Sequence, residues 1–370
     1  MKRKYFFLVI AAVIFSGCAG YSPVIKEGGL SAEEEMLKTR LEEAFMDCYS
    51  GFTGSILIAK DNRIILNKGY GLTNIEKNIA NQGKTAYHIV SLTKAFTAMA
   101  VLMLEEEGLL SVEDQAADYL PEFQTLRGIT LHHLLTHTSG ISGRKYNWET
   151  VSEAFANGKP EKAPGEEMQY SNGNYILLGK IIEKVSGEKY TDFMNKRILG
   201  PLGLEGSGWF YGDIPEEYKS LGYRFTDREK RTEIFPEPLE DLVLPPDDYP
   251  AGGLYSTTED MFRWHRALNS RVLVKKETID KMFAPYAPVD PVMWEVAAHT
   301  SEAHYGYGWC VYEDRSDNRF AMHEGAFPGY SIIITRGIDN GTFIMILSNL
   351  NYILDEIVAM NDAALEILSE

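Results

Sequence analysis

The sequence predicts an α/β fold in which both ends of the chain build one antiparallel sheet flanked by helices, with an all-helical region inserted between them. Two observations support this prediction: strand patterns occur near both termini, and the middle of the chain carries long helical patterns separated by loops. Strands grouped apart from helices are typical of packed layers of sheet and helix. The chain has 370 residues, more than one hydrophobic core usually fills, so we expect two packed regions.

Two β-hairpins are expected where apolar runs flank turn residues. The turn of the first hairpin is Asp61-Asn62, and the turn of the second is Asp339-Asn340-Gly341. The strands that these turns join are 55–59 with 63–66 near the N-terminus, and 331–336 with 342–348 near the C-terminus.

Helices are expected where apolar residues recur with a helical period. Ser31 followed by Ala-Glu-Glu is a typical helix start, because a serine at the cap accepts a hydrogen bond from the first turn. The helical patterns lie at 31–48, 92–110, 174–185, 258–268 and 353–368.

The composition is that of a globular protein, with 45% hydrophobic and 24% charged residues. The net charge of −17 argues against a nucleic-acid partner, because neutralising phosphates requires a basic surface. Three cysteines are too few for a disulfide scaffold. Cys48 and Cys310 are expected either to pair in an oxidising compartment or to remain as buried free thiols.

The first residues are typical of an export signal. Lys2-Arg3-Lys4 precedes an apolar run at 6–15, which is too short to span a bilayer as a helix but suits a signal peptide. Simple secretion and an uncleaved anchor are the alternatives. The segment Phe15-Ser16-Gly17-Cys18 resembles a bacterial lipobox, which implies cleavage before Cys18, a lipid on Cys18, and a membrane partner in the cell envelope.

The candidate reactive pair is Ser91 and Lys94. The helical pattern that follows Ser91 is apolar on nearly every face, so the helix is expected to be buried, with Ser91 at its start and Lys94 one turn on. A lysine without water has a lowered pKa and can act as a base toward a neighbouring hydroxyl. Two further Ser-x-x-Lys pairs, Ser142/Lys145 and Ser186/Lys189, have no such buried helix start.

Two more groups of residues could complete a site. In Tyr170-Ser171-Asn172, ahead of a second helix, a phenol can relay a proton and an amide can orient a lysine and a substrate carbonyl, although a capping loop would look the same. In His323-Glu324-Gly325-Ala326, the glycine allows a close approach to the strand and the next N–H can stabilise an oxyanion. His304-Tyr305-Gly306 fits the same loose pattern, but His323 adjoins the C-terminal hairpin.

In this order, Ser-x-x-Lys, Tyr-x-Asn and His-x-Gly resemble the motifs of the serine β-lactamase-like family, which includes class C β-lactamases, DD-peptidases and family VIII-type esterases. The resemblance covers about residues 35–370 and implies a catalytic domain at 31–370. Its α/β part covers about 31–85 and 290–370, and its helical part covers about 86–289. A signal peptide at 1–17 and a lipid-anchor linker at 18–30 precede it.

The resemblance also implies roles for single residues. Ser91 would be the acylated nucleophile, Lys94 its proton partner, and Tyr170 the general base and acid. Asn172 would position the substrate, and the N–H groups of Ser91 and Ala326 would form the oxyanion hole. His323 and Gly325 would complete the substrate-binding set.

One departure from the family bears on the substrate. Where its β-lactamases carry Lys-Thr-Gly, this chain has His323-Glu324-Gly325, so the resemblance implies an exported hydrolase of esters or D-amino-acid peptides and amides more than of β-lactams. An acyltransferase using the same acyl-enzyme and a penicillin-binding sensor without turnover are the alternatives. The oligomeric state is left open.

We expect neither a metal ion nor another cofactor. His132, His133 and His137 have the i, i+4 spacing of metal ligands. However, no His-Glu-x-x-His is present and the segment ends in Thr138-Ser-Gly, which favours capping and packing.

Overall fold

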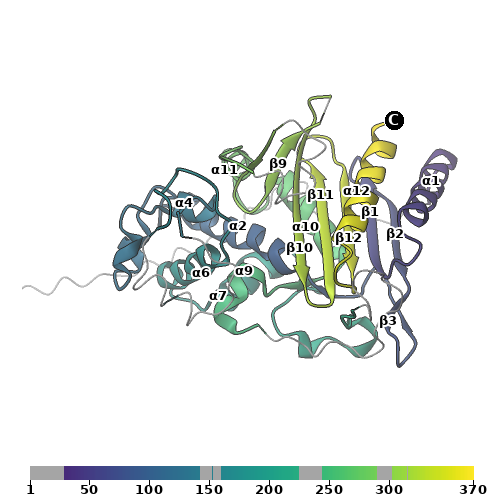
Figure 1. Cartoon of the computed structure of the whole chain (residues 1–370), viewed down its shortest axis with the longest axis horizontal. Helices are drawn as coiled ribbons and strands as arrows, with labels where there is room; N and C mark the ends of the chain where they lie inside the picture. Colours follow the sequence, from purple (N-terminus) through teal and green to yellow (C-terminus); the bar gives the residue numbers. More distant parts are fainter. Residues whose placement is uncertain (1–28, 142–151, 153–159, 225–243, 290–301, 315) are drawn as a thin grey trace, which may run out of the picture.

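The computed structural model describes residues 29–141, 152, 160–224, 244–289, 302–314 and 316–370. The N-terminal part of the chain supplies β1 (Gly54–Lys60) and β2 (Arg63–Tyr70) to the main sheet. The C-terminal part supplies β7 (Ala287–Pro288), β8 (Ala303–Tyr305), β9 (Cys310–Glu313), β10 (Arg319–Phe327), β11 (Tyr330–Gly337) and β12 (Phe343–Ser348). Within the described residues these form one eight-stranded sheet in the order β2-β1-β12-β11-β10-β9-β8-β7 (Figure 1).

The two chain ends meet inside this sheet, at its second and third strands. β1 pairs antiparallel with β12, with Gly54 opposite Ser348, and every other neighbouring pair is also antiparallel. Asp61 and Asn62 form the β1–β2 turn with φ values of 52° and 61°, the left-handed conformation that a tight hairpin requires. The predicted antiparallel sheet built by both ends is confirmed.

Helices cover both faces of the sheet. On one face α1 (Ala32–Cys48) lies beside α12 (Leu354–Ser369) (Figure 1). On the other face α10 (Thr258–Ser270) packs against β12, where the rings of Phe262 and Phe343 lie 5.5 Å apart. Side chains alternate across each strand, so Leu57 belongs to one core and Ile58 to the other.

The first predicted helix begins as the sequence indicated. Ser31 caps α1 in a capping box, in which its side chain accepts from the Glu34 N–H and the Glu34 carboxylate accepts from the Ser31 N–H. The predicted helices at 258–268 and 353–368 are also confirmed, as α10 and α12.

Most of the inserted region lies on the side of the sheet away from α1 (Figure 1). Its helices are α2 (Thr93–Glu106), α3 (Ala116–Tyr119), α4 (Leu131–Leu135), α6 (Asn172–Ser186), α7 (Tyr190–Met194), α8 (Gly200–Leu202), α9 (Tyr249–Gly252) and α11 (Lys276–Met282). Short 3₁₀ turns are η1 (Val90–Leu92), η2 (Gln124–Leu126), η4 (Tyr211–Asp213), η5 (Glu216–Tyr218) and η6 (Pro246–Asp248), and η3 (Asn195–Leu199) is a π-helical turn.

The prediction of an all-helical insert was wrong in one respect. The ribbon of β5 (Tyr87–His88) and β6 (Tyr255–Ser256) pairs the beginning of the insert with a segment near its end. A second small ribbon, β3 (Leu72–Asn74) with β4 (Ile79–Ala80), follows β2. Two-residue strands carry too little periodic pattern to be found from the sequence.

Cys48 is half-buried and Cys310 is buried, and both are free thiols, so of the two expectations the unpaired state is confirmed. The predicted signal peptide, the linker and Cys18 lie outside the described residues, apart from the last two residues of the linker. Among the described helices, none is both long and apolar enough to cross a membrane.

Candidate active site

Ser91 and Lys94 meet where the chain enters α2. Ser91 lies in the turn η1 and is 8% exposed, and Lys94 is the second residue of α2. The Lys94 Nζ lies 3.2 Å from the Ser91 Oγ and 2.6 Å from the carbonyl oxygen of Ala251, to which it donates. A carbonyl from α9 thus fixes the amine beside the hydroxyl. α2 begins at Thr93, one residue after the predicted start at 92, and Ser91 lies in the turn η1 that directly precedes it.

Lys94 is fully buried, and this burial lowers the pKa of its amine well below the usual value. Among the described residues, no carboxylate forms an ion pair or hydrogen bond with Lys94 that would favour the charged form. A neutral amine has a free lone pair, so Lys94 can accept the hydroxyl proton of Ser91.

The turn that carries Ser91 has a strained backbone. Val90 has a φ of 48°, which is rare for a β-branched residue. Hydrogen bonds hold the turn from both sides, since the Ile89 N–H donates to the Leu254 carbonyl at 3.0 Å and the Leu92 N–H donates to the Ile89 carbonyl at 3.1 Å. The position of the Ser91 backbone N–H therefore depends on contacts from distant parts of the chain.

β10 runs directly past this turn at Gly325. A Cβ on Gly325 would lie 3.1 Å from the Ile89 oxygen and 3.3 Å from the Val90 Cβ, so the glycine is needed for the close approach. Ala326 follows at an exposed position opposite Ser331. β10 contains all four residues from His323 to Ala326, so this segment is part of the sheet and pairs with β11.

The Tyr-x-Asn segment lies just before and at the start of α6. Tyr170 is half-buried, and the Lys94 Nζ lies 5.0 Å from the centre of its ring. Ser171 is the N-cap residue, and Asn172, which is buried, is the first residue of the helix rather than part of the preceding loop. The structure thus brings Tyr170 to the Ser91–Lys94 pair.

His323 faces the same region from β10 and is buried. Its Nδ1 donates to the carbonyl oxygen of Glu324 at 2.7 Å, so the Nε2 accepts from the hydroxyl of Tyr305 at 3.1 Å. Burial lowers the pKa of His323 to about 3. His323 is therefore a neutral imidazole at this place.

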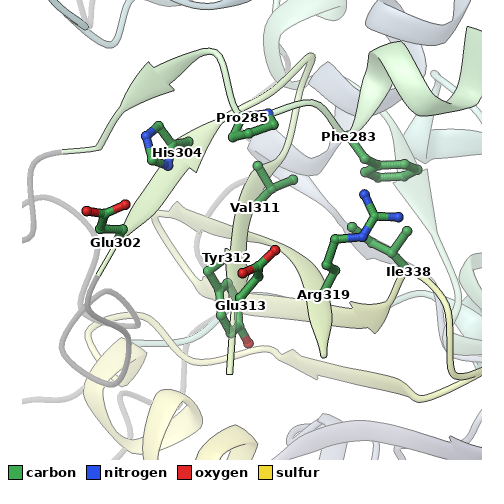
Figure 2. Close-up of a pocket in the computed structure, with 9 residues that line it drawn as sticks. All are labelled: Phe283, Pro285, Glu302, His304, Val311, Tyr312, Glu313, Arg319 and Ile338. Carbon is green, nitrogen blue, oxygen red and sulfur yellow. The ribbon is translucent and has the colours of Figure 1, made fainter. Parts of the chain in front are cut away.

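The residues of the alternative triplet, His304-Tyr305-Gly306, have side chains in two different places. His304 lines a separate cavity of about 310 Å³, together with Glu302, Val311 and Arg319 (Figure 2). Tyr305 instead contributes the hydroxyl that binds His323. The two His-x-Gly segments, which the sequence presents as alternatives, thus meet through Tyr305.

The expectation of capping and packing at the histidine-rich segment is confirmed for two of its three residues. His133 completes a capping box with Thr130 at the start of α4, and the Nδ1 of His132 lies 2.8 Å from the Tyr307 hydroxyl. His137 is different, because its ring lies in the site, with its centre 4.4 Å from that of Tyr170. In the described part of the chain, no group of three or more His, Cys, Asp or Glu residues could hold a metal ion.

The sequence analysis did not identify His137 as a site residue. It lies close in sequence to His132 and His133, and the i, i+4 spacing of these histidines is typical of metal ligands. The sequence feature that could have distinguished His137 is its place in the polar turn just before Ser139-Gly140. The other two histidines lie further from that turn.

The remaining Ser-x-x-Lys pairs do not form a similar site in the described structure. Ser186 ends α6, and Lys189 precedes α7 in an extended conformation. Ser142 and Lys145 lie outside the described residues.

The chain belongs to the β-lactamase family. The family described as Beta-lactamase matches residues 39–369. The resemblance stated from the motifs is therefore confirmed, and it places the chain among β-lactamase-fold serine hydrolases.

Relatives and solved structures agree with this assignment. The putative penicillin-binding protein PbpX of Bacillus subtilis (strain 168) is 30% identical over 335 residues, which cover 88% of this chain and 78% of that protein. The octameric penicillin-binding protein homologue from Pyrococcus abyssi has a TM-score of 0.76 at 31% identity, covering 90% of this chain and 77% of that one. A penicillin binding protein from Bacillus halodurans has a TM-score of 0.72 at 25% identity, covering 87% and 98%.

Proposed function

We propose that this chain is an exported serine hydrolase that forms an acyl-enzyme on Ser91. It would act on esters or on D-amino-acid peptides and amides more than on β-lactams. The observation that carries the proposal is the 3.2 Å approach between the Ser91 Oγ and the fully buried Lys94 Nζ. A serine hydroxyl needs an adjacent base to become a strong nucleophile, and a lysine deprived of water supplies one.

In acylation, the Ser91 Oγ attacks the substrate carbonyl carbon while its proton passes to the neutral amine of Lys94, from which Tyr170 relays it to the leaving group. The N–H groups of Ser91 and Ala326 bind the oxyanion of the tetrahedral intermediate. The bond to the leaving alcohol or amine then breaks, and Tyr170 returns the proton to the leaving group. A water molecule attacks the ester on Ser91 with the same proton relay, which releases the acid and restores the serine.

The substrate preference rests on His323. The Lys-Thr-Gly motif of the family's β-lactamases supplies a positive charge to the carboxylate of the substrate. His323 is neutral here because its burial lowers its pKa to about 3. A neutral group at this position favours esters, amides and peptides in which no carboxylate lies beside the reacting carbonyl.

The test of the nucleophile is labelling by a fluorophosphonate probe. We expect Ser91→Ala to abolish labelling while the circular dichroism spectrum and Tm stay near those of the parent. Ser186→Ala is the matched control, because it alters another Ser-x-x-Lys pair and should label like the parent. Labelling that persists in Ser91→Ala would refute the proposal.

A substrate panel distinguishes the possible reactions of the acyl-enzyme. The panel is a p-nitrophenyl ester, a D-Ala-D-Ala peptide and a cephalosporin, each with and without an added alcohol. Among the described residues, no carboxylate hydrogen-bonds to Ser91 or Lys94 to assist deacylation, which favours transfer to an acceptor as the second candidate. Acylated alcohol as the main product would indicate an acyltransferase, and a stable acyl-enzyme without product would indicate a sensor.

A further inference from the structure

His137 contacts the loop before α6 on both sides of Tyr170. The N–H of Gln169 donates to the carbonyl oxygen of His137 at 2.8 Å. The N–H of Ser171 donates to the Nδ1 of the same residue at 3.2 Å. The N–H groups of the two residues that flank Tyr170 are therefore both held by one residue.

The ring of His137 also limits where the phenol can lie. Its centre is 4.4 Å from that of the Tyr170 ring, at an interplanar angle of 39°. The rings of Tyr175 and Tyr305 surround it further, at 5.1 Å and 4.9 Å. Because His137 is fully buried in this cluster, neither its ring nor the face of Tyr170 that it covers can shift without displacing the other rings.

The hydrogen bonds define which nitrogen of His137 carries the proton. The Nδ1 accepts from Ser171, and the Nδ2 of Asn174 lies 3.4 Å from it. Asn174 is oriented by the Ser139 hydroxyl, which donates to its Oδ1 at 2.8 Å. The proton is therefore on Nε2, which has no hydrogen-bond partner among the described residues.

The backbone of His137 is unusual as well. Its φ is 58°, in the left-handed region that histidine, asparagine and aspartate adopt more readily than other residues with a side chain. With this backbone, the carbonyl and the ring of one residue both contact the 169–171 segment. Burial lowers the pKa of His137 well below its usual value, so the ring stays neutral.

We propose that His137 is a positioning residue that holds the Tyr170 hydroxyl in line for proton transfer between Ser91, Lys94 and the leaving group. This inference rests on the proposed function, because it gives His137 no action except through Tyr170. It predicts that His137 affects the rate of acylation and not the affinity for substrate.

The experiment is a double-mutant cycle between His137 and Tyr170. His137→Asn keeps an acceptor near the Ser171 N–H and tolerates the left-handed backbone, whereas His137→Leu loses both properties. We measure the rate of fluorophosphonate labelling, and kcat and KM for a p-nitrophenyl ester, in the parent and in the Tyr170→Phe background. In the parent we expect about a 100-fold lower kcat for His137→Leu and about tenfold or less for His137→Asn, with KM nearly unchanged.

In the Tyr170→Phe background we expect both substitutions to have little further effect on kcat, because the hydroxyl that His137 positions is already absent. His265→Asn is the matched control. It replaces another fully buried histidine, which contacts Asn62 and Arg336 outside the site, and should lower Tm while leaving kcat near that of the parent.

Several outcomes would overturn the inference. A parent-like kcat for His137→Leu would do so, and so would an equal loss in both backgrounds, which would indicate general damage to the fold. If His137→Leu is not recovered folded, His137→Ala enters the same cycle. A parent-like rate for Tyr170→Phe would refute instead the role of Tyr170 in the proposed function.

Discussion

The reactivity that we propose for Ser91 depends on how water is kept from the Lys94 amine. A solvated lysine has a pKa near 10.4 and is charged at neutral pH. Lys94 is fully buried, and the carbonyl of Ala251, to which it donates, carries no negative charge that would stabilise an ammonium ion. The neutral form is therefore favoured, and it is the form that can take the proton of the hydroxyl.

The pH dependence of acylation tests this view of Lys94. Because the pKa of Lys94 is lowered, the base is lost only when the pH falls below that lowered value. We expect the rate of fluorophosphonate labelling to rise with pH along a limb with its midpoint well below 10.5. Lys94→Arg should label at least about 100-fold more slowly at every pH, since a guanidinium stays protonated.

The control for this substitution is Lys196→Arg, which alters a lysine paired with Glu188 on the surface. It should leave the pH profile unchanged. A parent profile with its midpoint near the value of a solvated lysine would contradict the argument, as would parent-like labelling of Lys94→Arg.

At the level of single residues, the motifs identified Ser91, Lys94, Tyr170 and His323 as neighbours, and the structure brings their side chains to one place. His137 was not identified, since what distinguishes it is a hydrogen bond to a residue 34 positions away. No local pattern encodes such a contact.

The contact between η1 and β10 is the central feature among the elements. It joins the turn that carries Ser91 to the strand that carries Ala326, and Gly325 is the point at which their backbones meet. The separation of the two N–H groups proposed for the oxyanion hole depends on this contact. Such donors stabilise an oxyanion only when their spacing is correct.

We expect Gly325→Ala to lower kcat about tenfold with a Tm within a few degrees of the parent. The added Cβ would lie 3.1 Å from the Ile89 oxygen, so β10 and the turn must separate by a few tenths of an ångström. Enzyme kinetics and thermal unfolding measure the two effects.

Gly308→Ala provides the comparison. Gly308 has a φ of 77°, and its Cβ would lie 2.8 Å from both the Lys94 oxygen and the Ala95 Cα, which are backbone atoms of α2. We expect Gly308→Ala to lower Tm by more than Gly325→Ala does. An unchanged kcat for Gly325→Ala would show that the approach of β10 does not matter for catalysis.

The limits of the element predictions have a common physical cause. Periodic apolar patterns located α1, α10 and α12 within a few residues, because burial of one face follows from local spacing. The start of α2 was located within one residue, but the turn η1 before it was not predicted, because Val90 adopts a φ of 48° against the preference of a β-branched residue. Contacts with Leu254 and β10 hold that turn, and they are invisible in the local sequence.

In the described part of the chain, three histidines are buried in the neutral form. His137, His265 and His323 are at most 1% exposed. Burial is the largest cause that lowers the pKa of each, to about 3 for His323. In the unfolded chain each would titrate near 6.5, so unfolding at lower pH is accompanied by uptake of protons.

We therefore expect the free energy of unfolding to fall as the pH drops from about 6.5 to 5, which is the window above the titration of most carboxylates. Each neutral buried histidine contributes a slope of about 1.4 kcal/mol per pH unit, so three contribute at most ~4 kcal/mol per pH unit. Urea denaturation at several pH values measures the slope. His265→Asn should reduce it by about a third, and an equal free energy of unfolding at both ends of the window would contradict the prediction.

Export and lipid attachment at Cys18 remain predictions, because these residues lie outside the described structure. The acidic charge of −17 makes electrostatic binding to anionic headgroups unfavourable. Attachment would therefore depend on the lipid itself.

The antiparallel sheet, the hairpins, the terminal helices and the family motifs could be derived from the chain alone, because each is encoded by neighbouring residues through periodicity, turn chemistry and spacing. Only tertiary packing decided how deeply Lys94 is buried and that the carbonyl of Ala251 binds it. The same is true of the hydrogen bond between Tyr305 and His323 and of the contacts by which His137 holds the segment around Tyr170. Those features join segments that are 18 to 157 residues apart, and desolvation of a charged group depends on everything that surrounds it and not on its own neighbours in sequence.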